Sequence, residues 1–275
     1  MPLPIAGNPI GKPFIELQSI DSTNKYAMGI VHGDQLSDGQ DEPQHGTAVF
    51  SHEQTAGKGQ RGKKWQSEKD TNISLSILLN PSPMRISEQF KLSVCIAVSV
   101  SEFFSKYAGD ETKVKWPNDL YWRDRKAGGV LIENVASGQP AIDSQQSTAA
   151  GQQLAVWKWA IVGIGININQ IFFPEDLQNP VSLKQITGKT FKPVELAKEL
   201  CLVVEKNYQL LMNRNFEKLF NNYQDHLYKK DEKVKLKKGS RVFETIIKGV
   251  SGTGKLITQQ SIEERFEFGE IEWIQ

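Results

Sequence analysis

The chain has 275 residues, of which 39% are hydrophobic and 24% charged, so it can bury an ordinary core in one large domain and one small one. Its formal net charge of +1 excludes a chain-wide electrostatic attraction to nucleic acid or to a membrane surface. The N-terminus lacks the basic start and apolar run of a signal peptide, and no apolar stretch is long enough to span a bilayer.

The two cysteines, Cys95 and Cys201, both fall inside amphipathic helical patterns. They are therefore predicted to be small core residues in a reducing compartment. No Cys/His cluster has the spacing of zinc ligands, so the sequence predicts no protein-bound metal site.

A short strand at 14–17 is followed by the polar run Asp21-Ser22-Thr23-Asn24 and a helix predicted over 25–31. All four residue types are preferred helix N-caps, so capping alone is the simplest interpretation. Four in a row exceed what one cap requires, and the surplus hydroxyls and amide are candidates to face a ligand.

The stretch from Gly57 to Trp65 packs three glycines and four cations into nine residues, after a strand at 46–51 and Gln54. Glycine lets backbone N–H groups approach a ligand, and the cations favour an anion, so the loop is suited to phosphate. It matches a dinucleotide fingerprint and nearly matches a P-loop. Both are rejected because no helical pattern follows and Lys64 stands where a P-loop needs Ser or Thr. A solvated basic turn is the alternative.

The middle of the chain alternates strands and helices. A half-buried strand is predicted at 72–79, a core-facing helix at 87–107, and strands at 112–116 and 126–133. The turn Pro117-Asn118-Asp119 follows Lys115-Trp116, and Gly128-Gly129 opens the strand beside Lys126. Glycines in a strand often mark a close backbone approach, so Lys126 is a candidate to reach a carboxylate or phosphate; a solvated hairpin lysine is the alternative.

A Gly-, Ser- and Gln-rich segment at 136–153 is predicted to extend a hairpin without a functional role. The apolar run 155–168 predicts a buried central strand, with Gly163 and Gly165 leaving one face bare. Amphipathic helices are predicted at 193–212, opened by Pro193, and at 216–228.

From about residue 230 short strands alternate with glycine turns, which predicts a small β-barrel. The expected strands cover 233–236, 241–244, 245–250, 255–258 and 272–274. We therefore expect a large domain at 1–229 and a small β domain at 230–275.

Taken in order, these motifs resemble the biotin–protein ligases (biotin–[acetyl-CoA-carboxylase] ligases) over almost the whole chain. The most diagnostic parts are the glycine loop and Lys115-Trp116-Pro117-Asn118-Asp119. The resemblance implies an α+β fold: a mixed central sheet with helices on one side, as in class II synthetases, and a small SH3-like β-barrel. It also implies a ligase-only enzyme without an N-terminal DNA-binding domain.

Such ligases use ATP, with Mg²⁺ on the nucleotide, to convert biotin to biotinyl-5′-AMP, and then acylate a lysine of a biotin carboxyl carrier domain. The resemblance implies catalytic roles for Lys126, Lys58 and Arg61. It implies a biotin site formed by Ser22, Thr23, Asn24, Gln54, Gly57, Lys58, Gly59, Gln60, Lys126 and Gly129. It implies nucleotide contacts from Arg61, Lys63, Trp65, Lys115, Asn118, Asp119 and Asn167. Many members have arginine where Lys58 and Gln60 stand, which predicts weaker retention of the intermediate here.

Three alternatives remain: a lipoate or octanoate ligase, which shares the catalytic fold; a non-catalytic biotin sensor; and a nucleic-acid-binding protein using the basic loop. The full glycine loop and the C-terminal β segment favour biotin, and the cations argue against a sensor. The near-zero net charge argues against nucleic acid. The expected location is the cytoplasm, with no membrane partner, and a homodimer is a candidate assembly.

Overall fold

The structure is a computed structural model that describes residues 8–34, 42–137, 156–175 and 177–274. Its larger part is a seven-stranded sheet in the order β1-β2-β3-β7-β6-β5-β4, in which only β1 and β2 pair in parallel among the named strands. The strands are β1 (Phe14–Leu17), β2 (Ala48–Ser51), β3 (Asn72–Leu79), β4 (Thr112–Lys115), β5 (Asp119–Trp122), β6 (Arg125–Ser137) and β7 (Val156–Asn167). All except β5 overlap strands predicted from the sequence, and β5 was not predicted.

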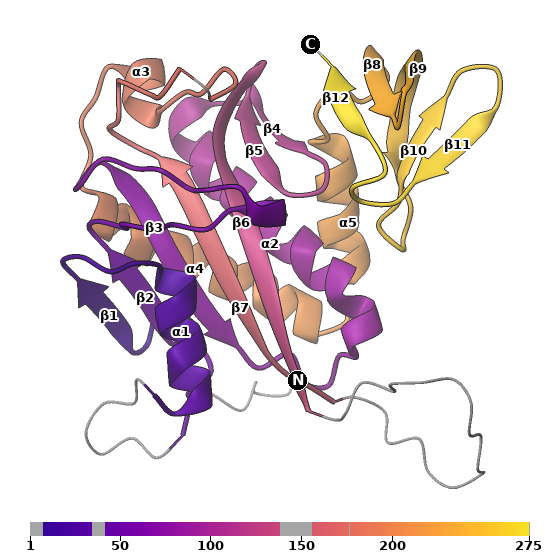
Figure 1. The fold of residues 1–275 in the computed structure, drawn as a ribbon. Helices are drawn as coiled ribbons and strands as arrows, with labels where there is room; N and C mark the ends of the chain where they lie inside the picture. Colours follow the sequence, from indigo (N-terminus) through magenta and orange to yellow (C-terminus); the bar gives the residue numbers. More distant parts are fainter. Residues whose placement is uncertain (1–7, 35–41, 138–155, 176, 275) are drawn as a thin grey trace, which may run out of the picture.

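One face of this sheet is apolar and carries the main core. Ile73, Leu75 and Ile77 on β3 and Ile164 and Ile166 on β7 join one buried cluster with residues of the helices behind the sheet. These helices are α2 (Gln89–Ala108), α4 (Pro193–Met212) and α5 (Phe216–Asp225) (Figure 1). Since side chains alternate along a strand, Ser74, Ser76, Gly163 and Gly165 are left on the opposite face.

The strand β3 is buried along its whole length, and the prediction of a half-buried strand is therefore wrong. Its polar positions do not face water. Ser76 lies beneath α1 (Thr23–His32), which crosses the front of the sheet in Figure 1, and Asn72 donates to Gln170 Oε1. Ala27 and Ile30 of this helix pack against a second, smaller apolar cluster that includes Leu78 and Ile161.

The observed architecture confirms the predicted mixed α+β fold. The expected arrangement of helices on one side holds for α2, α4 and α5, and α1 adds a single helix on the other face. That helix covers only part of the face, so the glycine-bearing strands β6 and β7 remain available to other segments.

Helix ends follow local capping signals. Gly109 ends α2, as predicted, whereas α5 ends at Asp225, three residues before the predicted limit. A short helix that was not predicted, α3 (Leu183–Thr187), begins after Ser182, whose hydroxyl accepts a hydrogen bond from the Gln185 N–H. The Ser-x-x-Gln capping box was the available signal for it.

The C-terminal segment forms a five-stranded antiparallel sheet in the order β11-β10-β9-β8-β12, where the sequence predicts the small barrel. The strands are β8 (Lys233–Lys238), β9 (Arg241–Val250), β10 (Leu256–Gln259), β11 (Glu263–Phe266) and β12 (Glu272–Ile274). The two strands predicted at 241–244 and 245–250 are one continuous strand, β9, whose first part pairs with β8 and whose second part pairs with β10. β11 was not predicted.

The two sheets share a continuous core. Leu236, Val250 and Phe266 belong to the same buried cluster as the helices behind the main sheet, and the Trp116 indole N–H donates to the Gly254 carbonyl oxygen at 2.9 Å. Because the two parts share this core, their division into domains 1–229 and 230–275 stays a proposal.

Cys95 and Cys201 are free and buried on α2 and α4, as predicted. Burial raises the pKa of the Cys201 thiol to about 12 and raises the pKa of Cys95 further. Among the described helices, none is both long and apolar enough to cross a bilayer. Most of the predicted hairpin extension at 136–153 lies outside the described residues.

Candidate functional site

The floor of the candidate site is the glycine-bearing face of β6 and β7. A Cβ atom on Gly163 would collide with the side-chain amide of Asn24, and one on Gly165 would lie 2.7 Å from the Trp65 ring. On β6, a Cβ on Gly129 would lie 3.0 Å from Asp119 Oδ1. The predicted absence of side chains on one face at Gly163 and Gly165 is confirmed. Glycine is needed at both positions because Asn24 and Trp65 pack directly onto the backbone there.

A buried polar cluster lies at the N-terminus of α1, over this floor. The Thr23 N–H donates to Gln54 Oε1 at 2.8 Å, and Ser76 Oγ lies 2.8 Å from Thr23 Oγ1 and 2.6 Å from Asn24 Oδ1. Asn24 Nδ2 donates to Glu133 Oε2 at 2.8 Å. Gln54, Ser76 and Glu133 thus hold two consecutive side chains of α1 in fixed orientations.

Ser22 occupies the N-cap position of α1 with extended backbone angles, yet its side chain makes no capping hydrogen bond. The residue is 2% exposed, so its hydroxyl is withdrawn from bulk water without serving the helix. This agrees with the expectation that the Asp-Ser-Thr-Asn run does more than cap.

The glycine loop folds back on itself above the floor. The Gly59 N–H donates to the Lys63 carbonyl oxygen at 2.7 Å and the Trp65 N–H to the Gly57 carbonyl oxygen at 2.9 Å. Arg61 has a φ of 54°, a left-handed conformation that is uncommon for a residue other than glycine. Gln60 Nε2 donates to the Val130 carbonyl oxygen at 3.3 Å, so the loop touches β6.

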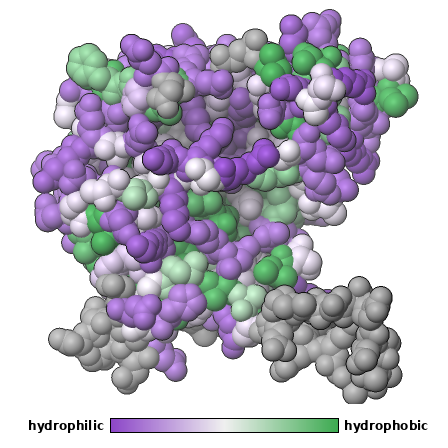
Figure 2. Space-filling view, viewed as in Figure 1, coloured by the Kyte–Doolittle hydropathy of each residue, from purple (hydrophilic) through white to green (hydrophobic). Residues whose placement is uncertain are grey.

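Between the loop and the sheet lies a cavity of about 520 Å³. It is lined by Thr55, Ala56, Gly57, Lys58, Gly59, Arg61, Gly62, Lys63, Lys64, Leu131 and Glu133. Lys58 Nζ lies 3.7 Å from Glu133 Oε1, so Glu133 contacts both the loop and, through its other oxygen, Asn24. Figure 2 shows hydrophilic side chains in a band across this face, at the height of the loop's helical turn η1 (Gln60–Gly62).

Lys126 and Asp119 form an ion pair beside Gly129, with Lys126 Nζ 2.7 Å from Asp119 Oδ1. Lys115, Asp119 and Gly129 are register partners across β4, β5 and β6. Directly opposite residues on paired strands project from the same face, so Lys115 and the ion pair lie on the glycine-bearing side of the sheet.

Lys115 is half-buried beneath aromatic rings. Its Nζ lies 4.8 Å from the ring centres of Tyr121 and Trp273 and 5.7 Å from that of Tyr228. Desolvation lowers the pKa of Lys115 to about 8. The Asp119 carboxylate opposes this shift, and the charges of Lys126 and Lys63 add to it.

Three predicted site residues are held mainly by the protein itself. Asn118 Nδ2 donates to the Val130 carbonyl oxygen at 2.5 Å, and Asn167 Nδ2 donates to the Val181 carbonyl oxygen at 3.1 Å. Trp65 lies over Gly165, and its buried indole N–H has no hydrogen-bond partner among the described residues. The structure thus brings Trp65 to the glycine floor and places Asn167 at the end of β7, against the segment before α3.

Several residues of the site were not predicted. Ser76 and Glu133 hold Asn24, and Tyr121, Tyr228 and Trp273 surround Lys115. Polar Ser74 and Ser76 on an otherwise apolar strand were a usable signal. Tyr228 and Trp273 gave none, because only the folded chain brings residues so distant in sequence to Lys115.

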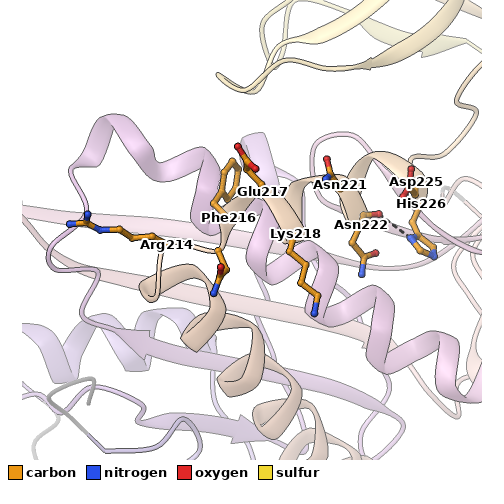
Figure 3. Close-up of a pocket in the computed structure, with 9 residues that line it drawn as sticks. Arg214, Phe216, Glu217, Lys218, Asn221, Asn222, Asp225 and His226 are labelled. Atoms are coloured by element: carbon orange, nitrogen blue, oxygen red, sulfur yellow. Dashed lines mark hydrogen bonds between the residues drawn. The ribbon is translucent and has the colours of Figure 1, made fainter. Parts of the chain in front are cut away.

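A second hollow of about 800 Å³ lies along α5, among residues 214–226 (Figure 3). It contains none of the predicted site residues. In Figure 3 Arg214 and His226 lie at opposite ends of the row, so the labelled side chains do not converge on one point. We assign no role to this hollow.

Comparison with known proteins relates the chain to one family. Residues 17–142 match the Biotin/lipoate A/B protein ligase family, and this stretch contains the loop, Lys115, Asp119 and Lys126. The chain is thus similar to members of this family over the stretch that carries most of the candidate site. Its fold is similar to that of a biotin protein ligase from Aquifex aeolicus in complex with biotin and ATP, with a TM-score of 0.73, 25% sequence identity, and coverage of 95% of this chain and 98% of that one.

Curated family members show the same relationship at the sequence level. The chain is 31% identical to the bifunctional ligase/repressor BirA of Bacillus subtilis over 204 residues, which are 73% of this chain and 55% of that protein. It is 27% identical to the biotin–[acetyl-CoA-carboxylase] ligase of Paracoccus denitrificans over 65% of this chain and 66% of that one. The match with the first of these relatives thus spans about half of that protein's length.

Proposed function

We propose that this protein activates biotin with ATP to give biotinyl-5′-AMP and pyrophosphate, and then transfers the biotinyl group to a lysine of a biotin carboxyl carrier domain. One observation carries the proposal: a buried polar cluster around Asn24, the Lys126–Asp119 ion pair and a cationic loop meet on one glycine-floored face. The biotin and ATP bound to the similar Aquifex aeolicus ligase support the choice of substrates.

The polar cluster suits the ureido ring of biotin, which carries two N–H donors and one carbonyl acceptor. Ser22, Thr23 and Asn24 offer hydroxyl and amide groups that are withdrawn from water, where hydrogen bonds discriminate most strongly between ligands, and the half-buried Gln54 accepts from the Thr23 N–H. Gly129 leaves the backbone of β6 without a side chain, whereas Asn24 and Trp65 occupy the space over Gly163 and Gly165. Gly57, Lys58 and Gly59 line the cavity on the loop side, and Gln60 contacts the Val130 carbonyl oxygen of β6.

In the first step a carboxylate oxygen of biotin attacks the α-phosphorus of ATP, an O–P bond forms, and pyrophosphate leaves. Lys126 is the catalytic cation between the two anionic reactants, and Asp119 fixes its position. Lys58 and Arg61 add positive charge from the loop as negative charge shifts to the leaving group. The protein's contribution is therefore positioning and charge stabilisation.

In the second step the amine of the acceptor lysine attacks the carbonyl carbon of the mixed anhydride, an amide bond forms and AMP leaves. The intermediate would hydrolyse if water reached it, and a loop folded over the cavity excludes water. Gln60, held on the Val130 carbonyl oxygen, contributes a neutral donor to this cover.

The nucleotide side is proposed to comprise Arg61, Lys63, Trp65, Lys115, Asn118, Asp119 and Asn167. Mg²⁺ neutralises phosphate charge when it is bound with ATP, and Asp119 is the carboxylate in position to hold it. In the described part of the chain no three acidic, His or Cys side chains form a metal-binding group. This donor set fits a magnesium ion that keeps most of its ligands from water and the phosphates.

A lipoate or octanoate ligase is the second candidate, because the family description includes lipoate. The buried hydroxyl and amide groups around Asn24 favour a polar ureido ring over an alkyl chain or dithiolane ring, which offers them no hydrogen bond. A sensor that binds biotin alone would have no use for Lys126, Arg61 and Lys63.

We further propose a cytoplasmic location, where the free thiols of Cys95 and Cys201 would persist. A homodimer and the absence of a nucleic-acid partner also remain proposals.

The deciding experiment is ATP–pyrophosphate exchange by the purified protein with Mg²⁺ and biotin, lipoate or octanoate in turn. Exchange with biotin alone supports the proposal, and exchange with lipoate or octanoate overturns the choice of acid. Transfer is then tested with a recombinant biotin carboxyl carrier domain and its variant in which the acceptor lysine is replaced by arginine.

A further inference from the structure

Trp273 of the last strand, β12, closes an aromatic enclosure around Lys115 of the main sheet. The enclosure consists of Tyr121, Tyr228 and Trp273, and the lysine ammonium also donates to the Tyr121 hydroxyl at 3.1 Å. The Tyr228 ring centre lies 4.8 Å from that of Tyr121 and 5.8 Å from that of Trp273. Three different segments of the chain therefore fix one cation.

This enclosed cation lies beside the proposed reaction centre. Lys115 is the register partner of Asp119, whose Oδ1 lies 2.7 Å from Lys126 Nζ. Free lysine side chains sample many rotamers, but the three surrounding rings restrict Lys115 to the face that carries the ion pair. A fixed ammonium at this position is suited to a phosphate oxygen of the nucleotide.

The C-terminal sheet reaches the same side of the site at two further points. Phe268 meets Trp116 edge to face with ring centres 5.8 Å apart, and a Cβ on Gly269 would lie 3.4 Å from the guanidinium carbon of Arg61. Figure 1 shows this sheet beside β4 and β5 and apart from α1. The second sheet therefore borders the cationic end of the site and lies away from the polar cluster around Asn24.

We infer that Trp273 is a positioning residue for the adenylation step, which holds Lys115 where it meets the phosphates of ATP. The inference rests on the proposed function and adds to it a role for the C-terminal sheet. Trp273 itself touches Lys115 and no reacting atom. Loss of the Trp273 ring is expected to raise KM for ATP and to leave KM for biotin unchanged.

The test is a double-mutant cycle in the pyrophosphate-exchange assay with Lys115→Ala, Trp273→Ala and the double variant. Each single change is expected to raise KM for ATP about tenfold, as for the loss of one charge-assisted contact, with KM for biotin within about twofold. The double variant is expected to match the single ones, because both changes remove the same interaction. Trp273→Phe, which keeps a ring, should restore most of the loss.

Phe243→Leu in β9 is the matched control, since this ring also lies beside a cation, with Arg241 Cζ 4.8 Å from its centre, but belongs to another part of the small sheet. It should leave KM for ATP unchanged. If Trp273→Ala fails to fold, Trp273→Leu replaces it in the cycle.

Two results would overturn the inference. One is a double variant whose KM for ATP rises about a hundredfold, which means that the two effects are independent. The other is an equal rise in KM for ATP and KM for biotin in Trp273→Ala, with no recovery in Trp273→Phe. That result means that Trp273 only stabilises the sheet. Failure of the proposed function is seen separately, as a lack of biotin-dependent exchange in the unaltered protein.

Discussion

Lys126 Nζ lies 2.7 Å from Asp119 Oδ1, and both groups face the side of the sheet on which Gly129, Gly163 and Gly165 leave the backbone bare. The carboxylate holds the ammonium beside Gly129, and both side chains stay partly exposed to water. A lysine in this position can exchange part of its contact with Asp119 for a developing charge on substrate.

Lys126→Ala should therefore abolish most of the exchange activity. A preorganised cation at a charge-developing centre is worth about 10²–10³ in kcat. Lys126→Arg keeps the charge but changes its geometry, and it should retain a small part of the activity. Lys198→Ala is the control, because this lysine forms an exposed pair with Glu195 on α4. Near-normal exchange by Lys126→Ala would contradict the assigned role.

Gly163→Ala should damage the biotin site specifically. The added methyl group would collide with the Asn24 side chain, so the polar cluster must shift or the strand must move. We expect a loss of about 1–3 kcal/mol in unfolding free energy and at least a tenfold weaker binding of biotin by calorimetry. Gly252→Ala is the control, because nothing lies within 4 Å of its added Cβ. Unchanged biotin affinity in Gly163→Ala would place the acid elsewhere.

Glu133→Gln should separate the two contacts of this side chain. The amide oxygen can still accept from Asn24 Nδ2, but the charge that attracts Lys58 is lost. Since a solvent-accessible ion pair contributes about 0–1 kcal/mol, trypsin should cleave the substrate-free loop up to about fivefold faster, with little change in biotin KM. Glu263→Gln, which removes an exposed pair with Arg265, should leave loop cleavage unchanged. Slower cleavage of the Glu133→Gln loop would refute a restraining contact.

The pH dependence of ATP use should report on Lys115. Because burial lowers the pKa of Lys115 to about 8, its positive charge is present below pH 8 and is lost as the pH rises through that value. KM for ATP should rise roughly fivefold between pH 8 and pH 9, following the fraction of charged lysine. Lys115→Arg stays charged throughout and should remove this rise. The groups that face Lys115 are Asp119, Tyr121, Lys126, Lys63, Tyr228 and Trp273.

The fold was largely predictable because strand periodicity and glycine positions are local signals. The run 156–167 was recognised as a central strand from its apolar residues, and its glycines were recognised as a bare face. The sequence does not distinguish one long strand from two short ones at 241–250, because their separation would depend on how β8 and β10 pair with them.

The site was predictable only where a motif names its residues. Thr23, Asn24 and Gln54 were expected in one site, and the Thr23 N–H does donate to Gln54 Oε1. Lys126 was expected between the carboxylate and the α-phosphate, and it is paired with Asp119 on the glycine-bearing face. Ser76 and Glu133 were missed as partners of Asn24 because their contacts depend on strand register. The enclosure of Lys115 was missed because Tyr228 and Trp273 meet it only after the second sheet has packed against β4 and β5.

The most direct test of biotin activation is ATP–pyrophosphate exchange by the purified protein with biotin, lipoate or octanoate. We predict exchange with biotin, none above background with lipoate or octanoate, and loss of the biotin-dependent exchange in Lys126→Ala. Exchange with lipoate in place of biotin would contradict the assignment of the polar cluster around Asn24. Tight biotin binding without any exchange would contradict the adenylation chemistry itself.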